Sequence, residues 1–492
     1  MTQDTTALKS SAQGVPRLRP GSKIYLMGIC GTGMAALAGL LKEKGFNITG
    51  SDSGFYPPMN QVLEKLLIPV YKGYNPDNIR DAAPDMVIIG NVIRATNPEA
   101  VQVMEQDIPF MSFPQALGEF FLHDRNSLVV AGTHGKTTTS AMLVSALKGC
   151  GARPGFLIGG VVTDAGKGFE KGEPPWFVIE GDEYDTAFFD KVSKFLHYKP
   201  KNAIITSMEF DHADIFKDFS EIQSSFERFV KLLPGNGILV ACADWPAVMK
   251  TAEKARCASI TYGFNQDADW MPEKVCISRE NTTYLAVNRQ QDIKIPVTIR
   301  APGRHNVLNS LSVLALCHAL GLDIDGVVAG LRKCRGVKRR QEIRGIINGI
   351  TIIDDFAHHP RAVSETLAAL KERFIGQRLV AVFEPRTNTS RRNIFQDDYA
   401  QAFSAADRII VREVPEPEKF SGLKLFSSKQ LAEDLKMQGK DAECLPDASA
   451  IITSILEDAK PGDVYAILSN GPFENIHQRL MDSLKKTGET RR

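Results

Sequence analysis

A glycine-rich turn in the middle third of the chain constrains the fold more than any other feature of the sequence. The turn, VAGTHGKTT at 130–138, follows an apolar run at 127–132 and precedes a helical pattern at 137–149. Glycine lets the backbone approach an anion closely, and the positive end of the following helix dipole attracts negative charge. Lys136 can reach the outer phosphates of a nucleotide, and the Thr137 hydroxyl can reach a magnesium ion. The turn therefore predicts an ATP site formed by Gly132, Thr133, His134, Gly135, Lys136, Thr137 and Thr138.

Carboxylates after the following strands are candidates for binding Mg²⁺ beside the triphosphate. Glu180 ends the apolar run at 176–180, where a sheet carboxylate can face the glycine turn, and oxygen ligands suit Mg²⁺. The acidic residues at 182–185 are interpreted equally well as a solvated turn. The segment Asp211-His212-Ala213-Asp214 is a further candidate, although a lone histidine is more often structural than metal-bound. Thr137 and Glu180 are the metal ligands that the residues themselves favour.

A second glycine turn lies near the N-terminus, between an apolar run ending at Gly28 and a helical pattern at 34–44. It contains G-x-G-x-x-A, and Asp52 closes the next strand about twenty residues on, which is the spacing of a dinucleotide fingerprint. A UDP-sugar satisfies the same geometry as NAD, and a turn that only packs helix on strand remains an alternative. A turn that only packs helix on strand is also an alternative for the phosphate loop at 130–138, because the strict phosphate-loop pattern places glycine where Val130 stands.

Length and composition limit the class of protein. A chain of 492 residues exceeds one ordinary core, so we expect several domains. The 59 Lys and Arg residues nearly balance the 58 Asp and Glu, so no nucleic-acid or membrane surface is indicated. No apolar run reaches the roughly 18 residues of a spanning helix, and no signal-peptide pattern is found. The 8 cysteines form no C-x-x-C pair, which indicates buried thiols in a reducing compartment. We expect a cytoplasmic protein.

Apolar runs and helical patterns alternate along the chain, and the alternation restarts twice. The expected strands lie at 24–28, 46–52, 85–91, 127–132, 176–180, 202–208, 237–242, 349–355, 378–384, 407–413 and 463–471. Such alternation predicts βαβ units with parallel sheets, whereas the shorter runs at 262–300 favour antiparallel strands. We therefore predict an α/β protein of three tandem domains. These are a Rossmann-like domain at 21–125, a P-loop ATPase-like domain at 126–336 and a Rossmann-like domain at 337–492, after a flexible arm at 1–20.

Six motifs in this order resemble the Mur ligases, which are ATP-dependent, amide-forming enzymes of peptidoglycan synthesis. The resemblance covers the chain from about residue 21 to its end. The motifs are the first glycine turn at 28–34, the phosphate loop at 132–137, the acidic motif at 180–183, D-H-x-D at 211–214, G-x-H-N-x-x-N at 303–309 and D-D-Y-x-H-x-P at 354–360. The chain departs from the family in having Gly181 for alanine, Phe356 for tyrosine and a turn at 471–475 that is poorer in glycine. The position of the carbamylated lysine of several Mur ligases falls near Phe226, so none is expected here.

The resemblance implies further roles. The second Mg²⁺ would be bound by His212. The adenine site would consist of His305, Asn306 and Asn309. The C-terminal domain would close over ATP through Arg340, Asp355 and His358. The UDP moiety would lie on Gly31, Thr32, Gly33 and Met34, near Asp52, with Asn91 and Arg94 as weaker candidates. The catalytic residues would be Lys136, Glu180, His212 and Arg340.

Three stretches, at 51–65, 183–198 and 384–389, resemble one branch of the family. That branch joins the tripeptide L-alanyl-γ-D-glutamyl-meso-diaminopimelate to UDP-N-acetylmuramate in peptidoglycan recycling. In the last stretch Arg386 offers a planar fork suited to a carboxylate of diaminopimelate, with Asn388 beside it, and a surface arginine is the alternative. The implied partners are UDP-N-acetylmuramate and a murein tripeptide, and the implied assembly is a monomer or weak homo-oligomer.

Other functions remain open at this point. The branch that adds L-alanine to UDP-N-acetylmuramate is the nearest alternative. An NAD-dependent oxidoreductase built on the first glycine turn would leave the phosphate loop unexplained. A non-catalytic UDP-sugar sensor that uses ATP as a switch is disfavoured by the presence of Lys136, Thr137 and Glu180.

Overall fold

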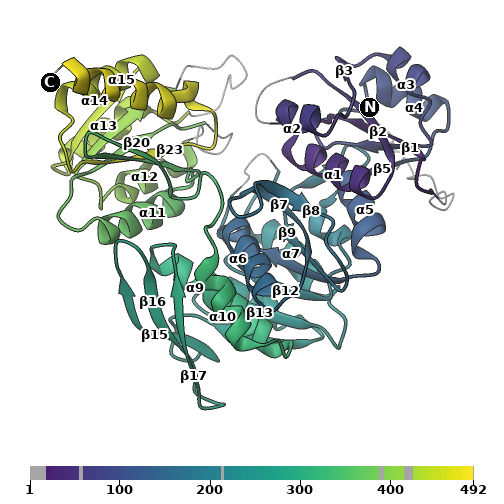
Figure 1. The fold of residues 1–492 in the computed structure, drawn as a ribbon, viewed down its shortest axis with the longest axis horizontal. Coiled ribbons are helices and arrows are strands. Elements are labelled where there is room, and N and C mark those ends of the chain that lie inside the picture. Colours follow the sequence, from purple (N-terminus) through teal and green to yellow (C-terminus); the bar gives the residue numbers. More distant parts are fainter. Residues whose placement is uncertain (1–17, 55–58, 212–214, 387–392, 415–424, 491–492) are drawn as a thin grey trace. The chain divides into compact units, whose positions relative to one another are not determined.

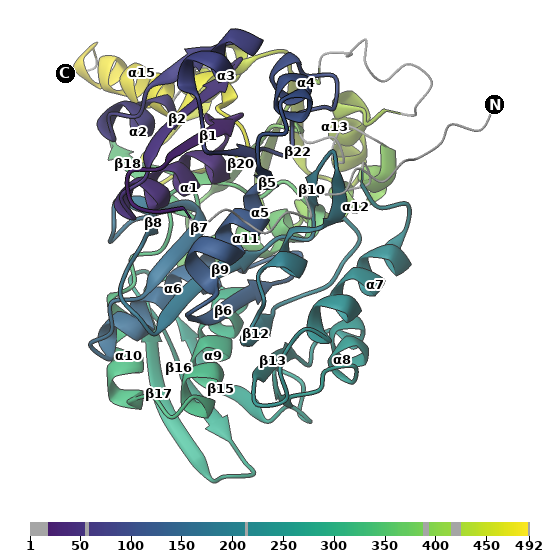
Figure 2. The same ribbon diagram turned by 90° about the vertical axis from the view of Figure 1, so that its right-hand side faces the viewer.

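The computed structural model describes residues 18–54, 59–211, 215–386, 393–414 and 425–490. Contacts within the chain divide it into two compact units. The first unit consists of residues up to 208 together with 220–262 and 312–330. The second consists of 209–219, 263–311 and 331–492. Each unit is described by itself below, and Figures 1 and 2 show the elements of both.

The first unit begins with a five-stranded parallel sheet in the order β3-β2-β1-β4-β5. Its strands are β1 (Lys23–Met27), β2 (Asn47–Asp52), β3 (Val70–Lys72), β4 (Met86–Ile89) and β5 (Phe110–Ser112). Its helices are α1 (Thr32–Glu43), α2 (Met59–Lys65), α3 (Pro76–Ala82), α4 (Pro98–Glu105) and α5 (Phe113–Leu117). Alternate residues of β1 and β4 pack on α3 and α4, and α1 lies on the other face (Figure 1). Burial on both faces explains why β1 and β4 are continuous apolar runs.

A second parallel sheet follows in the same unit, in the order β14-β13-β12-β6-β9-β7-β8, with only β8 antiparallel. Its strands are β6 (Asn126–Ala131), β7 (Gly155–Val162), β8 (Lys167–Glu170), β9 (Trp176–Gly181), β12 (Asn202–Ile205), β13 (Ile238–Cys242) and β14 (Ala258–Tyr262). Its helices are α6 (Lys136–Gly149), α7 (Phe219–Val230) and α8 (Pro246–Ala252). A small hairpin is formed by β10 (Asp185–Ala187) and β11 (Asp190–Ser193). Because β6 lies between β9 and β12, the carboxyl ends of these three strands meet around the glycine turn.

The two sheets of the first unit are joined through the contact of α1 with β8. Gly39 of α1 faces the Phe169 ring, and a Cβ atom at Gly39 would lie 2.2 Å from Phe169 Cζ. The ring therefore occupies the space that a side chain at Gly39 would need. A salt bridge of 3.1 Å between Glu43 and Lys167 lies beside this contact.

The second unit contains an antiparallel sheet and a mostly parallel sheet. The antiparallel strands are β15 (Trp270–Ile277), β16 (Thr282–Asn288) and β17 (Ile293–Ile299). The helices that follow them in the chain, α9 (Arg304–Ala319) and α10 (Ile324–Lys333), belong to both units, since residues 312–330 are part of the first. The other sheet has the order β18-β19-β23-β20-β21-β22, with only β18 antiparallel. Its strands are β18 (Glu342–Ile347), β19 (Ile350–Asp355), β20 (Leu379–Phe383), β21 (Arg408–Arg412), β22 (Asp441–Leu445) and β23 (Val464–Leu468).

Helices cover both faces of this last sheet (Figure 1). They are α11 (Pro360–Arg373), α12 (Gln396–Ala402), α13 (Ser428–Met437), α14 (Ala448–Asp458) and α15 (Ile476–Thr490). One hydrophobic core lies between the sheet and α11, α12 and α13, and a second lies between the sheet and α14 and α15. Alternate residues of β20 supply both cores, Ala381 to the first and Val382 to the second.

The predicted fold class, α/β with parallel sheets, is confirmed. Each strand expected from an apolar run is present, and the segment 262–300 is antiparallel as expected. The division into domains at 125 and 337 stays a prediction. In the described part of the chain, no helix has both the length and the apolar character that crossing a membrane requires.

Candidate active site

The phosphate loop connects β6 to α6, as its sequence predicts. Gly135 caps α6 with φ 81°, a left-handed conformation that favours glycine. Gly132 has φ 135°, and a Cβ atom there would lie 2.2 Å from Thr206 Oγ1. The loop is fixed from the end of β12, because the backbone N–H of His134 donates to Ser207 Oγ at 2.9 Å and Thr206 Oγ1 donates to the His134 carbonyl at 2.5 Å. The first N–H groups of a helix have no partner within the helix, and the start of a helix after such a loop favours an anion.

Lys136 is buried at the start of α6 and is held between the loop and the acidic segment after β9. Its Nζ donates to the Gly132 carbonyl at 2.6 Å and forms a salt bridge with Glu183 Oε2 at 3.0 Å. Burial by itself lowers the pKa of Lys136, but the Glu183, Asp182 and Glu180 carboxylates outweigh it, so the pKa lies above its ordinary value. Lys136 is therefore a fixed positive charge at the loop.

Thr137 and Glu180, the two predicted metal ligands that the structure describes, lie next to each other. The Thr137 hydroxyl donates to Glu180 Oε2 at 3.1 Å. The other carboxylate oxygen, Oε1, accepts from the backbone N–H of Gly159 at 2.8 Å, and Glu180 is only 9% exposed. A hydroxyl and a carboxylate oriented in this way at the phosphate loop fit Mg²⁺, which prefers oxygen ligands and is usually shared with phosphates. His212, the third predicted ligand, lies outside the described residues.

The first glycine turn is organised by Asp52. One carboxylate oxygen accepts from the backbone N–H of Cys30 at 2.8 Å, and the other accepts from Gly54 at 2.9 Å. Gly31 caps α1, which begins at the exposed Thr32. Asp52 thus supports the turn through hydrogen bonds that the dinucleotide interpretation did not include.

The remaining candidates for the UDP site lie on either side of this turn. Gly33 lies against the Phe113 ring, and Met34 is buried. Asn91 and Arg94 are exposed in the loop after β4.

In the second unit, the structure brings together four of the residues assigned to ATP. Arg340 stacks over the Phe356 ring, with 4.7 Å between its guanidinium carbon and the ring centroid. His358 Nδ1 lies 3.0 Å from the Phe356 carbonyl oxygen. Asp355 accepts from the backbone N–H of Gln341 at 2.7 Å, and the Gln341 side chain lies 3.4 Å from His305 Nε2. Phenylalanine in place of the usual tyrosine therefore still offers an aromatic face for Arg340.

Charge and burial differ within this group. Burial raises the pKa of Asp355, although Arg340, the N–H groups of Ala357 and Gln341, and His305 oppose the rise. Arg340 is exposed. The side-chain amide of Asn306 donates to the Pro302 carbonyl at 2.7 Å, and that of Asn309 donates to Asn306 at 3.2 Å, so both are buried parts of the start of α9.

Arg386, the candidate for the peptide carboxylate, is exposed after β20 and lies against Gly471. A Cβ atom at Gly471 would lie 2.4 Å from Arg386 Nη1. Arg339 donates to the carbonyls of Ser469 and Gly471 at 2.6 and 2.7 Å, which holds the backbone at the start of the glycine-poor turn at 471–475. Asn388 lies outside the described residues.

Three contributing residues were missed by reasoning from the sequence. Glu183 was interpreted equally well as part of a solvated turn, yet it is 3% exposed and paired with Lys136. Thr206 and Ser207 were assigned only to a strand. Their polar side chains at the carboxyl end of a buried apolar strand were a signal that could have identified them.

The three parallel sheets, the phosphate loop and its acidic neighbours define the class as a multidomain α/β enzyme of the phosphate-loop type. The chain belongs to the Mur ligase family. Three family models match it: the Mur ligase family catalytic domain at residues 23–125, the Mur ligase middle domain at 130–317 and the Mur ligase glutamate ligase domain at 339–471. It is therefore an ATP-dependent ligase that forms amide bonds.

Individual relatives cover almost the whole chain. The UDP-N-acetylmuramate–L-alanyl-γ-D-glutamyl-meso-2,6-diaminoheptandioate ligases of Escherichia coli K12 and Haemophilus influenzae are 39% and 37% identical to it, over 95% and 94% of this chain and 99% of each relative. The crystal structure of a murein peptide ligase from Psychrobacter arcticus 273-4 is similar with a TM-score of 0.70 and 34% identity, over 94% of this chain and 99% of that one. The UDP-N-acetylmuramate–L-alanine ligase of Acetivibrio thermocellus is 33% identical, over 93% of this chain and 95% of the relative.

Proposed function

We propose that this enzyme joins L-alanyl-γ-D-glutamyl-meso-diaminopimelate to UDP-N-acetylmuramate, using ATP and Mg²⁺, in peptidoglycan recycling. The observation that carries the proposal is the 39% identity to the E. coli tripeptide ligase over 99% of that relative, against 33% for an alanine-adding ligase. The exposed Arg386 beside Gly471 supports it, because a guanidinium suits a carboxylate of diaminopimelate.

The chemistry requires activation of a carboxylate, since a carboxylate and an ammonium form a salt and not an amide. In the first step, an oxygen of the lactyl carboxylate of UDP-N-acetylmuramate forms a bond to the γ-phosphorus of ATP, and the bond to the β-phosphate oxygen breaks. The products are an acyl phosphate and ADP. The amine of the tripeptide then adds to the acyl carbon and gives up a proton, and inorganic phosphate leaves with the C–O electrons. Catalysis is largely positioning and neutralisation of charge.

The residues of the phosphate loop would each have a separate role in positioning the triphosphate and neutralising its charge. The buried ammonium of Lys136 would neutralise the outer phosphates, and the first N–H groups of α6 would bind the oxygens between them. Thr137 and Glu180 would hold Mg²⁺, which when bound neutralises phosphate charge during transfer. The stacked Arg340 and the buried Asp355 would contribute from the C-terminal part, with the adenine near His305, Asn306 and Asn309.

The binding of UDP-N-acetylmuramate would use the first glycine turn. The first N–H groups of α1 at Thr32 and Gly33 would face the diphosphate, and Asp52 would hold the turn in place. We propose a cytoplasmic enzyme that acts as a monomer or weak homo-oligomer, because its substrates are soluble nucleotides and peptides.

A competition between acceptors tests the proposal. The enzyme is incubated with ATP, Mg²⁺ and UDP-N-acetylmuramate, together with either the tripeptide or L-alanine, and phosphate release and the product mass are measured. We expect kcat/KM at least a hundredfold higher with the tripeptide. An equal or higher value with L-alanine would assign the chain to the alanine-adding branch. If neither acceptor led to phosphate release, the result would argue against amide formation.

A further inference from the structure

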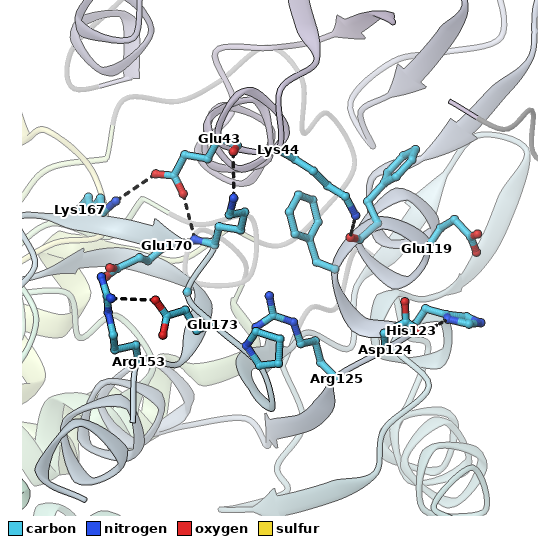
Figure 3. Close-up of a pocket in the computed structure, with 15 residues that line it drawn as sticks. Glu43, Lys44, Glu119, His123, Asp124, Arg125, Arg153, Lys167, Glu170 and Glu173 are labelled. Atoms are coloured by element: carbon cyan, nitrogen blue, oxygen red, sulfur yellow. Dashed lines mark hydrogen bonds and ion pairs between the residues drawn. The ribbon is translucent and has the colours of Figure 1, made fainter. Parts of the chain in front are cut away.

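A pocket of 760 Å³ lies inside the first unit, away from both glycine turns. Figure 3 shows its lining residues, which come from the end of α1, the segment 119–125, Arg153, and the strand β8 with the turn that follows it. The first glycine turn precedes the opposite end of α1, which is 12 residues or about 18 Å long. Arg125 directly precedes β6, whose other end leads to the phosphate loop. The pocket therefore lies at the edge of the sheets that the proposed chemistry does not use.

Most carboxylates around the pocket already have cationic partners. Glu43 forms a salt bridge with Lys167 at 3.1 Å, and its second oxygen accepts from the backbone N–H of Lys171 at 3.0 Å. Glu173 forms a salt bridge with Arg153 at 2.7 Å. Glu170 forms a salt bridge with Lys148 at 3.5 Å, and Asp124 Oδ1 lies 2.7 Å from His123 Nδ1. Glu119 lines the exposed side of the pocket.

Three cations of the lining have no carboxylate partner among the residues that the structure describes. Lys44 Nζ donates to the Phe120 carbonyl at 2.5 Å, and Lys171 Nζ donates to the Glu43 carbonyl at 3.2 Å. Arg125 Nη1 is buried and has no hydrogen-bond partner within the described residues. A buried guanidinium N–H without an acceptor is unfavourable, and a bound oxyanion would supply the acceptor.

The charges of these three side chains also act on one another. Burial lowers the pKa of Lys44, and the positive charges of Arg125 and Lys171 lower it further, although Asp124 and Glu119 oppose them. Burial also lowers the pKa of Arg125. Arg125 and Lys171 therefore act on Lys44 as like charges, and a bound anion would offset that repulsion.

We propose that this pocket binds a small, multiply charged anion of the phosphate class through Lys44, Arg125 and Lys171. The planar guanidinium can donate two parallel hydrogen bonds to phosphate oxygens, and the two ammonium groups add point charges. The pocket is larger than inorganic phosphate, and Phe120, Phe121 and Pro174 give it an apolar wall for an organic part of the ligand. A bound anion would link the end of α1, the start of β6 and the turn after β8.

Titration of the full-length protein with pyrophosphate tests the proposal. Because pyrophosphate also binds a phosphate loop, calorimetry is performed at low ionic strength on Lys136→Ala, which removes the cation of that loop, and on Lys136→Ala combined with Arg125→Gln. We expect the Arg125→Gln change to weaken binding at least tenfold. The matched control is Arg153→Gln in the same background, because Arg153 lines the same pocket but is paired with Glu173. This control should change affinity by less than twofold.

Equal weakening by the two arginine changes would overturn the proposal, since it would indicate general surface electrostatics. Binding of pyrophosphate to Lys136→Ala that is unaffected by Arg125→Gln would also overturn it. Thermal unfolding without pyrophosphate checks that the variants fold, and Arg125→Gln should not lower Tm, because it removes a cation without a carboxylate partner. If that variant does not fold, Lys171→Gln provides the same test, with the same expected loss of affinity.

Discussion

At the scale of single residues, the buried pair of Lys136 and Glu183 decides the charge at the phosphate loop. A lysine with only 8% exposure would lose its proton readily without a carboxylate nearby. The salt bridge to Glu183 and the neighbouring Asp182 and Glu180 prevent this. The acidic segment therefore has a role besides the metal binding proposed for Glu180, because it keeps Lys136 positively charged.

Changing Glu183 to Gln tests this role through the pH dependence of activity. The change removes the carboxylate that raises the pKa of Lys136 most, so the ammonium deprotonates at a lower pH. As the pH is raised, we expect Glu183→Gln to lose ADP-forming activity at a lower pH than the unmodified enzyme does. At neutral pH we expect its kcat/KM to be about tenfold lower. The control is Asp185→Asn, which lies in the same segment but pairs with Lys191 at the surface. If ADP formation fell at the same alkaline pH in all three proteins, the role assigned to Glu183 would be contradicted.

Changing Gly132 to Ala tests the close approach of the loop to the end of β12. A Cβ atom at this position would collide with Thr206 Oγ1 at 2.2 Å and would require φ 135° of an alanine. We expect KM for ATP to rise at least tenfold and Tm to fall. Gly235→Ala is the control, because no atom lies within 4 Å of the Cβ position there. A Gly132→Ala variant with the KM of the control would show that the loop tolerates the displacement.

The sequence predicted the residues of the loop, but not what fixes them. Glycine, lysine and threonine in a strand-to-helix turn have a local meaning, so Gly135, Lys136 and Thr137 could be assigned. Thr206 and Ser207 act on the loop from more than 70 residues further on, through hydrogen bonds that depend on β12 lying next to β6. Strand order is a property of the tertiary fold, and the hydrophobic periodicity of a sequence does not predict it.

At the scale of secondary structure, burial explains which elements could be predicted. The central strands β1, β6 and β23 are apolar runs because helices cover both faces of their sheets. The strands β3 and β5 have three residues each and lie at the edges of the first sheet, where burial is incomplete. Edge strands of this length do not produce a distinct pattern in the sequence.

The contact of α1 with β8 gives a prediction about stability. Replacing glycine by alanine inside a helix normally stabilises it by about 1 kcal/mol. At Gly39 we expect the opposite, a lower Tm, because the Phe169 ring occupies the Cβ position. The destabilisation should be partly reversed in the double variant Gly39→Ala with Phe169→Leu, which provides room. Thermal unfolding monitored by circular dichroism measures both, and a higher Tm for Gly39→Ala alone would contradict the described packing.

At the scale of the whole molecule, one buried carboxylate ties together distant parts of the second unit. Asp354 of β19 is 2% exposed and forms ion pairs with Arg339 at 3.4 Å, Arg344 at 3.2 Å and His477 at 3.3 Å. Burial by itself raises the pKa of Asp354, but these three partners outweigh it and hold the pKa below its ordinary value. Asp354 therefore contributes stability above about pH 4, the ordinary range of aspartate, and this stability is lost as the pH falls through the lowered pKa.

We expect Asp354→Asn to lower the free energy of unfolding by about 3 kcal/mol at pH 7, because Arg339 and Arg344 lose their carboxylate partner. The difference from the unmodified protein should narrow as the pH falls below about 4, where the carboxylate becomes protonated in the unfolded chain while it is still ionised in the native state. Urea unfolding at several pH values measures it. Asp441→Asn is the control, since Asp441 is exposed and its partner Arg408 keeps two other carboxylates, so it should contribute less than about 1 kcal/mol. A constant difference at all pH values would mean that packing, and not charge, accounts for the loss.

The absence of a side chain at Gly471 has a consequence for how the preference for an acceptor could change during evolution. Any side chain at this position would displace Arg386, since its Cβ atom would lie within 2.4 Å of the guanidinium. Under the role proposed for Arg386, a lineage that acquired alanine here would move this guanidinium and so change its preference for an incoming peptide, without altering Arg386 itself. Natural variants at position 471 are therefore the place to look for ligases of this architecture that have drifted to another acceptor.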